Sequence, residues 1–412
     1  MANRLLCRLL LGALAIAGAP FFTPPSEACP FCGASGTTLT DDVNQASMVL
    51  YGALKNPRLD AGNEFSGGAT DLDVLAVVKK HEILGDKKSI VLPRYIPVDK
   101  DSKVKFLIFC DVFKGKLDPY KGVPVKSDDI VKYLSGAVTL KDKDIPTRLK
   151  FFFGWLDNAD VEISNDAYKE FGNADYKDFR PMAKDLPADK VVKWLKDPNT
   201  PGFRFGLYAS MLGHAGKPEH AVVLRQLLDD PQKRLSSGVD GMLAGYTMLN
   251  PQEGWAYTRN IMADPHGRLL GGGFGLIGGG AGTAYLKDQS RDFMLRYAAL
   301  RSARFFWEYR PDLVSNKQVL ETVSLLLDQS DIADLAVEDL RKWKAKEPLD
   351  KVLGLMDRPS HSIPIIRRAV LRYAMTFPDN PKATAFVAAL RKKDPEWVKD
   401  VEELMKIESG SK

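Results

Sequence analysis

The residues best suited to chemistry are the two cysteines of Cys29-Pro30-Phe31-Cys32. A two-residue spacing supports thiol–disulfide exchange when the pair opens a helix after a strand, because the helix N-terminus lowers the thiol pKa. Here no strand pattern precedes the pair. Haem attachment needs a histidine where Gly33 stands, and a zinc site needs further ligands, of which only His81 is near in sequence. The pair is therefore expected to be structural.

A second chemical motif is the glycine-rich stretch, whose core has the G-x-G-x-x-G spacing of dinucleotide-binding loops. Such a loop follows a strand within a βαβ unit, whereas a helical pattern ending at Asp264-Pro265 precedes this one. The sequence therefore predicts an inter-helix loop and no cofactor. Because long loops on helical repeats often form binding surfaces, we take the loop as the candidate binding site. It comprises Gly271, Gly272, Gly273, Phe274, Gly275, Gly278, Gly279 and Gly280.

The histidines give no catalytic or metal-binding pattern. No two of them have H-x-x-x-H spacing, and none adjoins a pair of carboxylates; they are His81, His214, His220, His266 and His361. The sequence also contains no G-x-S-x-G motif and no glycine–lysine phosphate loop. We therefore expect no catalytic, cofactor-binding or metal-binding residues, and a protein that is not an enzyme.

The length and composition of the chain are those of a globular protein. Its 412 residues, 45% hydrophobic and 27% charged, are too many for one ordinary core and predict two or three domains. The net charge is +5, and basic pairs such as Lys79-Lys80 lie beside acids such as Glu82. A nucleic-acid surface needs a clustered basic patch, so no nucleic-acid partner is expected.

Residues 1–28 have the pattern of a signal peptide. Arg4 and Arg8 precede an apolar run from Leu9 to Ala19, which is shorter than the ~20 residues that span a bilayer. A small-x-small cleavage site follows at residues 26–28, so the mature chain is expected to begin at Cys29. Lipidation of Cys29 is an alternative. The protein is expected to be exported to the periplasm, the cell surface or the medium, with no transmembrane segment.

Removal of Cys7 with the signal peptide leaves three cysteines, Cys29, Cys32 and Cys110. In an oxidising compartment one disulfide and one remaining thiol are expected. We predict that Cys110 pairs with Cys29 or Cys32, because closing a long loop stabilises more, by about 3–5 kcal/mol.

Residues 29–125 are expected to form a small β-domain. Strand-like runs at 46–52, 71–78, 89–93 and 105–110 are separated by turn signals such as Asn56-Pro57 and Gly85-Asp86. Strands this closely spaced, without helices between them, predict a small antiparallel barrel or sandwich.

The cysteine pair followed by these runs resembles the netrin-like, OB-type domain of the tissue inhibitors of metalloproteinases. The motifs in question are Ala46–Gly52, Asp71–Lys79, Lys105–Cys110 and Gly115-Lys116-Leu117. In that family the amine and carbonyl of the N-terminal cysteine chelate the zinc of a protease, a role that Cys29 would inherit. The family has one residue between its first cysteines, whereas this chain has two.

After a connecting segment at 126–147, residues 148–406 show helical periodicity and a repeat, and residues 407–412 are expected to be a disordered tail. Apolar segments stop before an acidic residue, with the last apolar residues at positions 156, 195, 228, 262, 327 and 356. The steps are mostly 29–39 residues, and the step of 65 is interpreted as two units. We expect each acidic residue to cap the next helix. We also expect a small residue in each unit to let paired helices approach closely; these are Ala167, Gly206, Gly238, Ala298, Ala336 and Ala369. Aromatic runs at 151–155 and 305–307 are assigned to the core.

The segment from Phe203 to Pro231 resembles a HEAT repeat, and Phe293–Leu300 and Ile365–Leu371 resemble its second helix. The resemblance implies an α-solenoid of helix pairs over 148–406, which offers a binding face rather than a reaction. The whole arrangement also resembles secreted proteins of planctomycete-type bacteria.

These observations lead to two hypotheses of different classes. The first is an exported, non-catalytic scaffold that holds a protein or extracellular polymer on its helical-repeat surface. The alternative is a metalloprotease-inhibitor-like module acting through Cys29; an unrecognised hydrolase is a weaker third. The sequence leaves the partner and the oligomeric state open.

Overall fold

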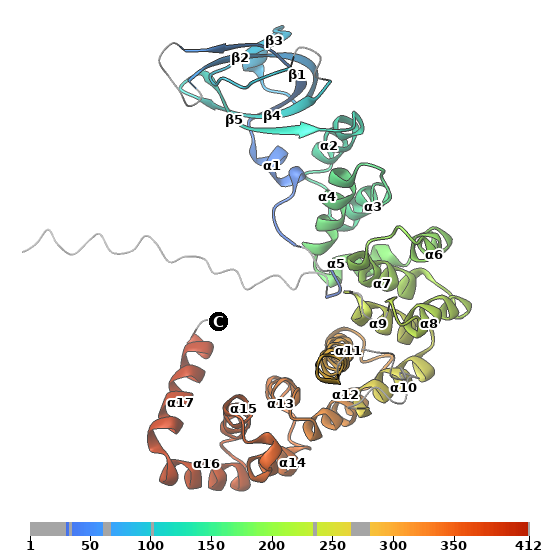
Figure 1. Cartoon of the computed structure of the whole chain (residues 1–412), viewed down its shortest axis with the longest axis vertical. Coiled ribbons are helices and arrows are strands. Elements are labelled where there is room, and N and C mark those ends of the chain that lie inside the picture. Colours follow the sequence, from blue (N-terminus) through green and yellow to red (C-terminus); the bar gives the residue numbers. More distant parts are fainter. Residues whose placement is uncertain are drawn as a thin grey trace, which may run out of the picture.

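The computed structural model describes residues 30–32, 35–60, 67–99, 103–233, 237–264 and 281–410. Helix α1 (Leu39–Gln45) leads into a sheet of β1 (Met48–Leu59), β2 (Gly68–Lys79), β3 (Ser89–Leu92), β4 (Lys105–Phe113) and β5 (Lys116–Val125), with the short helix η1 (Glu82–Leu84) between β2 and β3. All pairings are antiparallel, in the order β3-β2-β1-β4-β5 (Figure 1). The described strands thus form an open five-stranded sheet, in which the edge strands β3 and β5 do not pair with each other. Strand β5 and helix α1 were not predicted.

Both faces are buried at the centre of this sheet, which explains why the runs Met48–Tyr51 of β1 and Leu107–Cys110 of β4 are apolar without a break. Along β1, Met48 and Leu50 face a core that belongs to the sheet itself, while Val49 and Tyr51 face the helices. Alternate residues of a strand point to opposite faces, so such a strand has no polar side. The helix-facing residues are continuous with the core of the helical part, so the β-domain and the helices share one hydrophobic core.

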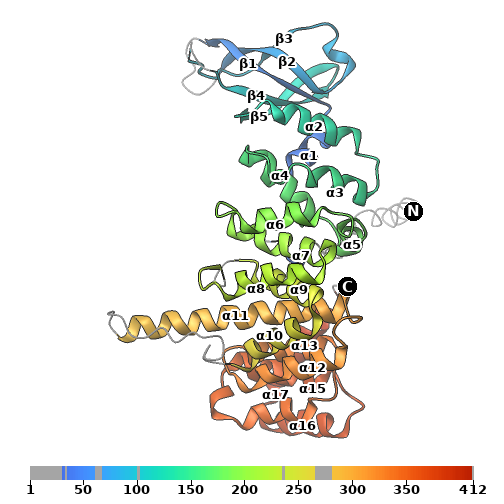
Figure 2. The same cartoon turned by 90° about the vertical axis from the view of Figure 1, so that its right-hand side faces the viewer.

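The remainder is helical. The helices are α2 (Asp129–Thr139), α3 (Ile145–Phe153), α4 (Val161–Gly172), α5 (Tyr176–Ala183), α6 (Ala188–Lys196), α7 (Phe205–Ala215), α8 (Ala221–Asp229), α9 (Val239–Leu249), α10 (Pro251–Ala263), α11 (Ala281–Tyr309), α12 (Asn316–Val323), α13 (Ala333–Lys342), α14 (Leu349–Leu353), α15 (Pro364–Met375), α16 (Pro381–Lys393) and α17 (Pro395–Gly410). Figure 1 shows them following one another in a curved row below the sheet, with α17 at the far end. In Figure 2 the N-terminal part of α11 projects beyond its neighbours.

The predicted stops of the repeat mark a recurring contact. At four of them the backbone carbonyl accepts a hydrogen bond from a side chain between 29 and 67 residues further along the chain. Arg204 donates to Leu156, Tyr257 to Leu228, Gln329 to Met262 and His361 to Leu327, at 2.7–3.2 Å. Carbonyls at and just beyond the end of a helix have no partner within it, so a side chain from later in the sequence satisfies each of these four. This contact joins successive helix pairs.

The 65-residue step includes residues 265–280, which lie outside the described residues, so its interpretation as two units stays a prediction. The expectation that the acidic residues cap the next helix was wrong at Asp157 and Asp328. Asp157 instead accepts hydrogen bonds from Lys190 and Trp194, and Asp328 accepts from Lys351 and Arg358. Each of these carboxylates thus connects the end of one helix to side chains of the helix pair that follows. The caps come from other residues, such as Asp160 and Asn380.

The small residues largely serve close packing. Ala167, Ala336 and Ala369 are buried. A Cβ on Gly206 would lie 3.1 Å from the Cα of Gly238, so these two glycines bring their segments into contact. Gly238 was expected inside a helix, but it precedes α9. Its φ of +112° is a conformation that favours glycine. The aromatic residues Phe152, Phe153, Phe305 and Phe306 are buried, which confirms their assignment to the core.

The boundaries of the helical part differ from those expected. The connecting segment 126–147 contains α2 and the start of α3, and α17 continues to Gly410 through most of the expected tail. Glu408 explains the longer helix, since it pairs with Arg341 and Arg372. The signal peptide lies outside the described residues. In the part of the chain that the structure describes, no helix has both the length and the apolar character needed to cross a membrane.

Candidate functional site

The candidate site is a groove between the last three helices. Asn380 caps α16 and Asp394 accepts a hydrogen bond from the amide of Trp397, so a sharp turn separates α16 from α17. Val398 and Val401 bury the first half of α17 against Leu371 of α15. Beyond that contact a groove of about 500 Å³ remains. This volume falls in the ~300–1,000 Å³ range of ligand sites.

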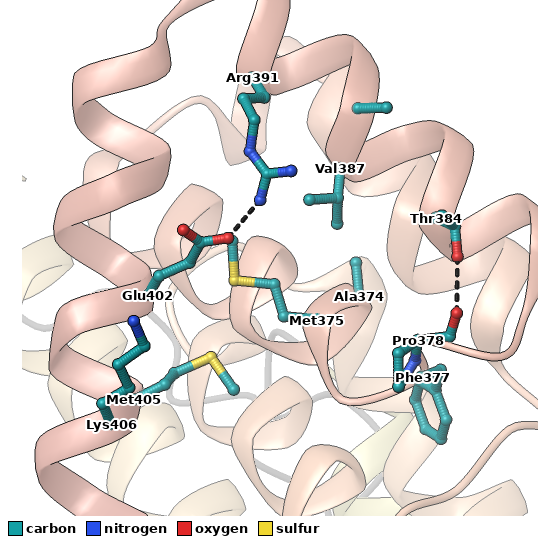
Figure 3. A pocket seen from close by; sticks show the side chains of 11 residues that line it. Ala374, Met375, Phe377, Pro378, Thr384, Val387, Arg391, Glu402, Met405 and Lys406 are labelled. Carbon is teal, nitrogen blue, oxygen red and sulfur yellow. Dashed lines mark hydrogen bonds and ion pairs between the residues drawn. The ribbon is translucent and has the colours of Figure 1, made fainter.

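The lining of the groove is mostly apolar (Figure 3). Its walls come from α15 and the turn that follows, from α16 and from α17; they are Ala374, Met375, Phe377, Pro378, Thr384, Val387, Ala388, Arg391, Glu402, Met405 and Lys406. Two methionines face each other across it, and flexible thioether side chains adapt to different apolar partners. Arg391 and Glu402 form an ion pair at the rim, and the Thr384 hydroxyl donates to the carbonyl of Pro378. The groove can therefore hold an apolar group and offers charges at its edge.

A buried polar cluster lies elsewhere, where the N-terminal segment meets α4. We call residues 30–32 and 35–46 the N-terminal strap, and Asp166 and Glu170 the strap carboxylates. Asp166 accepts hydrogen bonds from the amide of Leu39 and the hydroxyls of Thr40 and Tyr133, at 2.6–3.1 Å. Glu170 accepts from the hydroxyl of Thr38 at 2.7 Å.

Burial sets the protonation of the strap carboxylates. The pKa of the Glu170 carboxyl is raised to about 7, mainly by burial and also by the nearby Asp166 carboxylate, while Thr38 and Arg148 oppose the shift. Burial also raises the pKa of Asp166, which its three hydrogen-bond donors oppose. All the donors come from the strap or the adjacent core. The cluster therefore holds the strap in place rather than facing a substrate.

The first residues of the strap, residues 30–32, also pack into the helical core. Phe31 is 3% exposed and packs against Phe305 of α11, with ring centres 4.8 Å apart. Arg301 donates to the carbonyl of Pro30 at 3.0 Å and pairs with the buried Asp240 at 2.9 Å. A Cβ on Gly206 would lie 2.6 Å from the carbonyl oxygen of Phe31, so a glycine is required there.

The cysteines do not pair as predicted. Cys110 is a free thiol with no exposed surface, on the inner face of the sheet, where burial raises its pKa to about 12. Cys32 is disulfide-bonded, and its partner is not among the described residues. Cys110 fails to reach the strap because its side chain faces the core of the sheet rather than the helices. Cys29 lies outside the described residues.

The described histidines make structural contacts. His81 caps η1, His220 accepts from the amide of Lys217, and His361 donates to Leu327. His214 bonds to the hydroxyl of Tyr176 at 3.0 Å among aromatic rings, and burial lowers its pKa to about 3. Within the described ranges, no three His, Cys, Asp or Glu side chains come together as a metal site.

The sequence-predicted binding loop, Gly271–Gly280, lies outside the described residues, so its role stays a prediction. The groove and the strap carboxylates were not predicted. Asp166 and Glu170 were detectable in principle, because they share a helix face with the apolar Ile163 and Ala167. Comparison of the chain with family models, with curated proteins and with solved structures finds no match.

Proposed function

We propose that this chain is an exported, non-catalytic binding protein, and that its helical part is a HEAT-like α-solenoid which holds a protein or extracellular polymer. The β-domain is proposed to be OB-like, and the sheet supports this by enclosing a core of its own around Met48, Leu50 and Ile108. Two of the carbonyl contacts, which lie 29 and 34 residues apart, support the solenoid, since they join consecutive helix pairs in the same way.

The observation that carries the proposal is the groove at the end of the helical row. In a solenoid each internal pair is covered by the next one, so the last pair must present a capping surface. Here that pair leaves apolar side chains around the groove, Met375, Val387 and Met405, with an ion pair beside them. An apolar centre with a charged rim is the usual composition of a protein-binding surface.

The alternative of inhibition through Cys29 gains no support. A chelating N-terminus has to extend into the active site of a protease. In this chain Phe31 is buried and the carbonyl of Pro30 is bound by Arg301, so the residues next to Cys29 are held against the helices.

The proposal is tested by replacing Val387 in the mature full-length chain with a photo-crosslinking residue. The variant is irradiated in envelope extract of the organism that makes the protein. A matched control carries the same residue at position 222, where Val222 of α8 is 55% exposed. We expect adducts with a protein or polymer at position 387 but not at 222. Equal labelling at both positions, or none at 387, would contradict the proposal.

A further inference from the structure

Another pocket lies in the β-domain, where the sheet is open. The edge strands β3 and β5 do not pair with each other, yet Ile90 of β3 and Leu117 of β5 line one pocket of about 260 Å³. The two edges therefore come together around this space, which we call the seam pocket. Figures 1 and 2 show the sheet at one end of the molecule and α16 at the other, so the seam pocket is remote from the groove.

The apolar part of the lining belongs to the core of the sheet. Leu84 and Ile90 are 6% and 7% exposed and form part of the core that the sheet encloses, and Leu117 packs against that core. Ile83 adds a fourth apolar side chain to the lining. An alkyl chain in the pocket would thus lie against core residues. The volume has room for roughly eight methylene groups, if each takes the ~30 Å³ of a water molecule in the liquid.

The charged residues of the lining have one sign. Lys87 and Lys116 line the seam pocket, no acidic residue does, and both lysines are exposed, which places them at its mouth. Among the described residues, neither lysine side chain forms an ion pair or a hydrogen bond, and the nearby Glu82 and Asp86 do not pair with them. At the groove, by contrast, the arginine of the rim is paired with a glutamate. The seam pocket therefore combines an apolar interior with positive charge that no acid neutralises.

Two tight turns place these lysines. Lys116 begins β5 and lies opposite Phe113 across a two-residue turn, in which Lys114 and Gly115 have φ of +48° and +69°. Lys87 follows η1, and its amide donates a hydrogen bond to the carbonyl of Leu84 at 3.2 Å. The backbones of both lysines are thus fixed beside the pocket, while their flexible side chains can reach a bound anion.

We propose that the seam pocket binds an anion with a single alkyl chain, of the chemical class of the medium-chain fatty acids. The chain lies against Leu84, Ile90 and Leu117, where burial of its methylene groups favours binding. The anionic head lies between Lys87 and Lys116, where it neutralises two positive charges that otherwise repel each other. This site is separate from the groove, and its ligand does not depend on the proposed function.

Isothermal titration calorimetry of the mature full-length chain with decanoate tests the proposal. We expect a dissociation constant on the order of 0.1–1 mM, the affinity of a ligand with about twelve non-hydrogen atoms. Decyltrimethylammonium, which has the same chain and a cationic head, should bind far more weakly, and so should acetate, which has the head without the chain. No binding of decanoate up to about 5 mM, or equal binding of the cationic amphiphile, would overturn the proposal.

Substitutions assign the binding to this pocket. Lys87→Glu combined with Lys116→Glu should weaken decanoate binding at least about tenfold, because the head then meets two negative charges. The matched control combines Lys193→Glu with Lys196→Glu, which makes the same change of charge at two exposed lysines of α6 and should leave the affinity unchanged.

Two further variants separate the seam pocket from the groove. Ile83→Trp, at a partly exposed residue of the lining, fills the seam pocket and should also weaken decanoate binding. Ala388→Trp fills the groove and should leave this binding unchanged. Equal losses in the two pairs of lysine variants, or a loss in Ala388→Trp with none in Ile83→Trp, would place the ligand elsewhere and refute the proposal. Neither result would bear on adduct formation at position 387, which tests the proposed function.

Discussion

The guanidinium of Arg301 donates a hydrogen bond to the carbonyl oxygen of Pro30, at 3.0 Å, across 271 residues of sequence. The same arginine pairs with Asp240, which is 3% exposed. The first described residues of the chain are thus fixed to α9 and α11 in its middle. Further along the strap, Asn173 exchanges two hydrogen bonds of 2.9 Å with the backbone of Gly36.

Phe31→Ala tests how much the strap contributes to stability. Removing a buried phenylalanine side chain leaves a cavity and typically costs about 3–5 kcal/mol. We expect a loss of this size in the free energy of unfolding measured with urea. The control is Phe113→Ala, at a residue 63% exposed, which should change it by less than about 0.5 kcal/mol. Similar effects of the two substitutions would show that the strap is not bound in solution as described.

Glu170→Gln tests the strap carboxylates through pH. The pKa of Glu170 in the folded protein, about 7, is above its ordinary value of 4.5, so folding favours the protonated form. Its contribution to stability is complete below about pH 4.5 and is lost as the pH rises through 7. Glutamine keeps the uncharged shape at every pH. The free energy of unfolding of the variant, relative to that of the wild type, should therefore rise by on the order of 2–3 kcal/mol between pH 5 and pH 8.

The measurement is urea unfolding of both proteins across that pH range. Glu321→Gln is a matched control, because Glu321 is 63% exposed in its side chain and forms only an i,i+4 pair with Lys317. A difference between Glu170→Gln and the wild type that stays constant with pH would show that Glu170 is already ionised at pH 5.

Tyr373→Phe tests the carbonyl contacts between helix pairs. The buried Tyr373 hydroxyl donates to the carbonyl of Ala345 at 2.5 Å, 28 residues earlier. Removing it leaves a buried acceptor without a donor, at a cost of about 1–3 kcal/mol. Thermal unfolding should show the loss. The control Tyr120→Phe, at a residue 48% exposed, should leave the melting temperature almost unchanged. An unchanged melting temperature for Tyr373→Phe as well would argue against the contact.

Thiol titration tests the corrected cysteine assignment. Cys110 is buried and its pKa is raised to about 12, so in the native protein at pH 8 its thiol should not react with Ellman's reagent. In denaturant without a reductant, one thiol per mature chain should react, and peptide mapping should place it at Cys110. Two or more reactive thiols, or a Cys110 peptide joined to another cysteine, would contradict the structure.

The sequence predicts the local pattern of this fold better than its long-range contacts. The runs at 71–78 and 105–110 lie inside β2 and β4, and the apolar stops coincide with helix ends such as those of α8 and α10. These features depend on periodicity within a few turns of chain. Strand β5 was missed because Pro119, Gly122 and Pro124 weaken its strand pattern. An edge strand tolerates such residues because only one of its sides is paired.

The groove and the strap depend on contacts that no local pattern contains. Met375 and Met405 lie 30 positions apart and look like ordinary core residues of two helices. They line one groove only because α17 packs back against both α15 and α16. Likewise, the sequence around Cys32 suggests a disulfide to Cys110, and only the strand register, which directs Cys110 to the inner face of the sheet, excludes it.

The contact between Arg301 and Pro30 determines when the chain can complete its fold. A polypeptide leaves the ribosome from its N-terminus, and its early parts generally fold first. Here Pro30 and Phe31 emerge long before Arg301 and Phe305, whose side chains hold them. The sheet and the first helices can form early, but the beginning of the strap has no binding site until α11 has been made. Pro30 and Phe31 are therefore synthesised early but are among the last residues to reach their native positions. A chain that ends before α11 would leave Phe31 exposed to solvent.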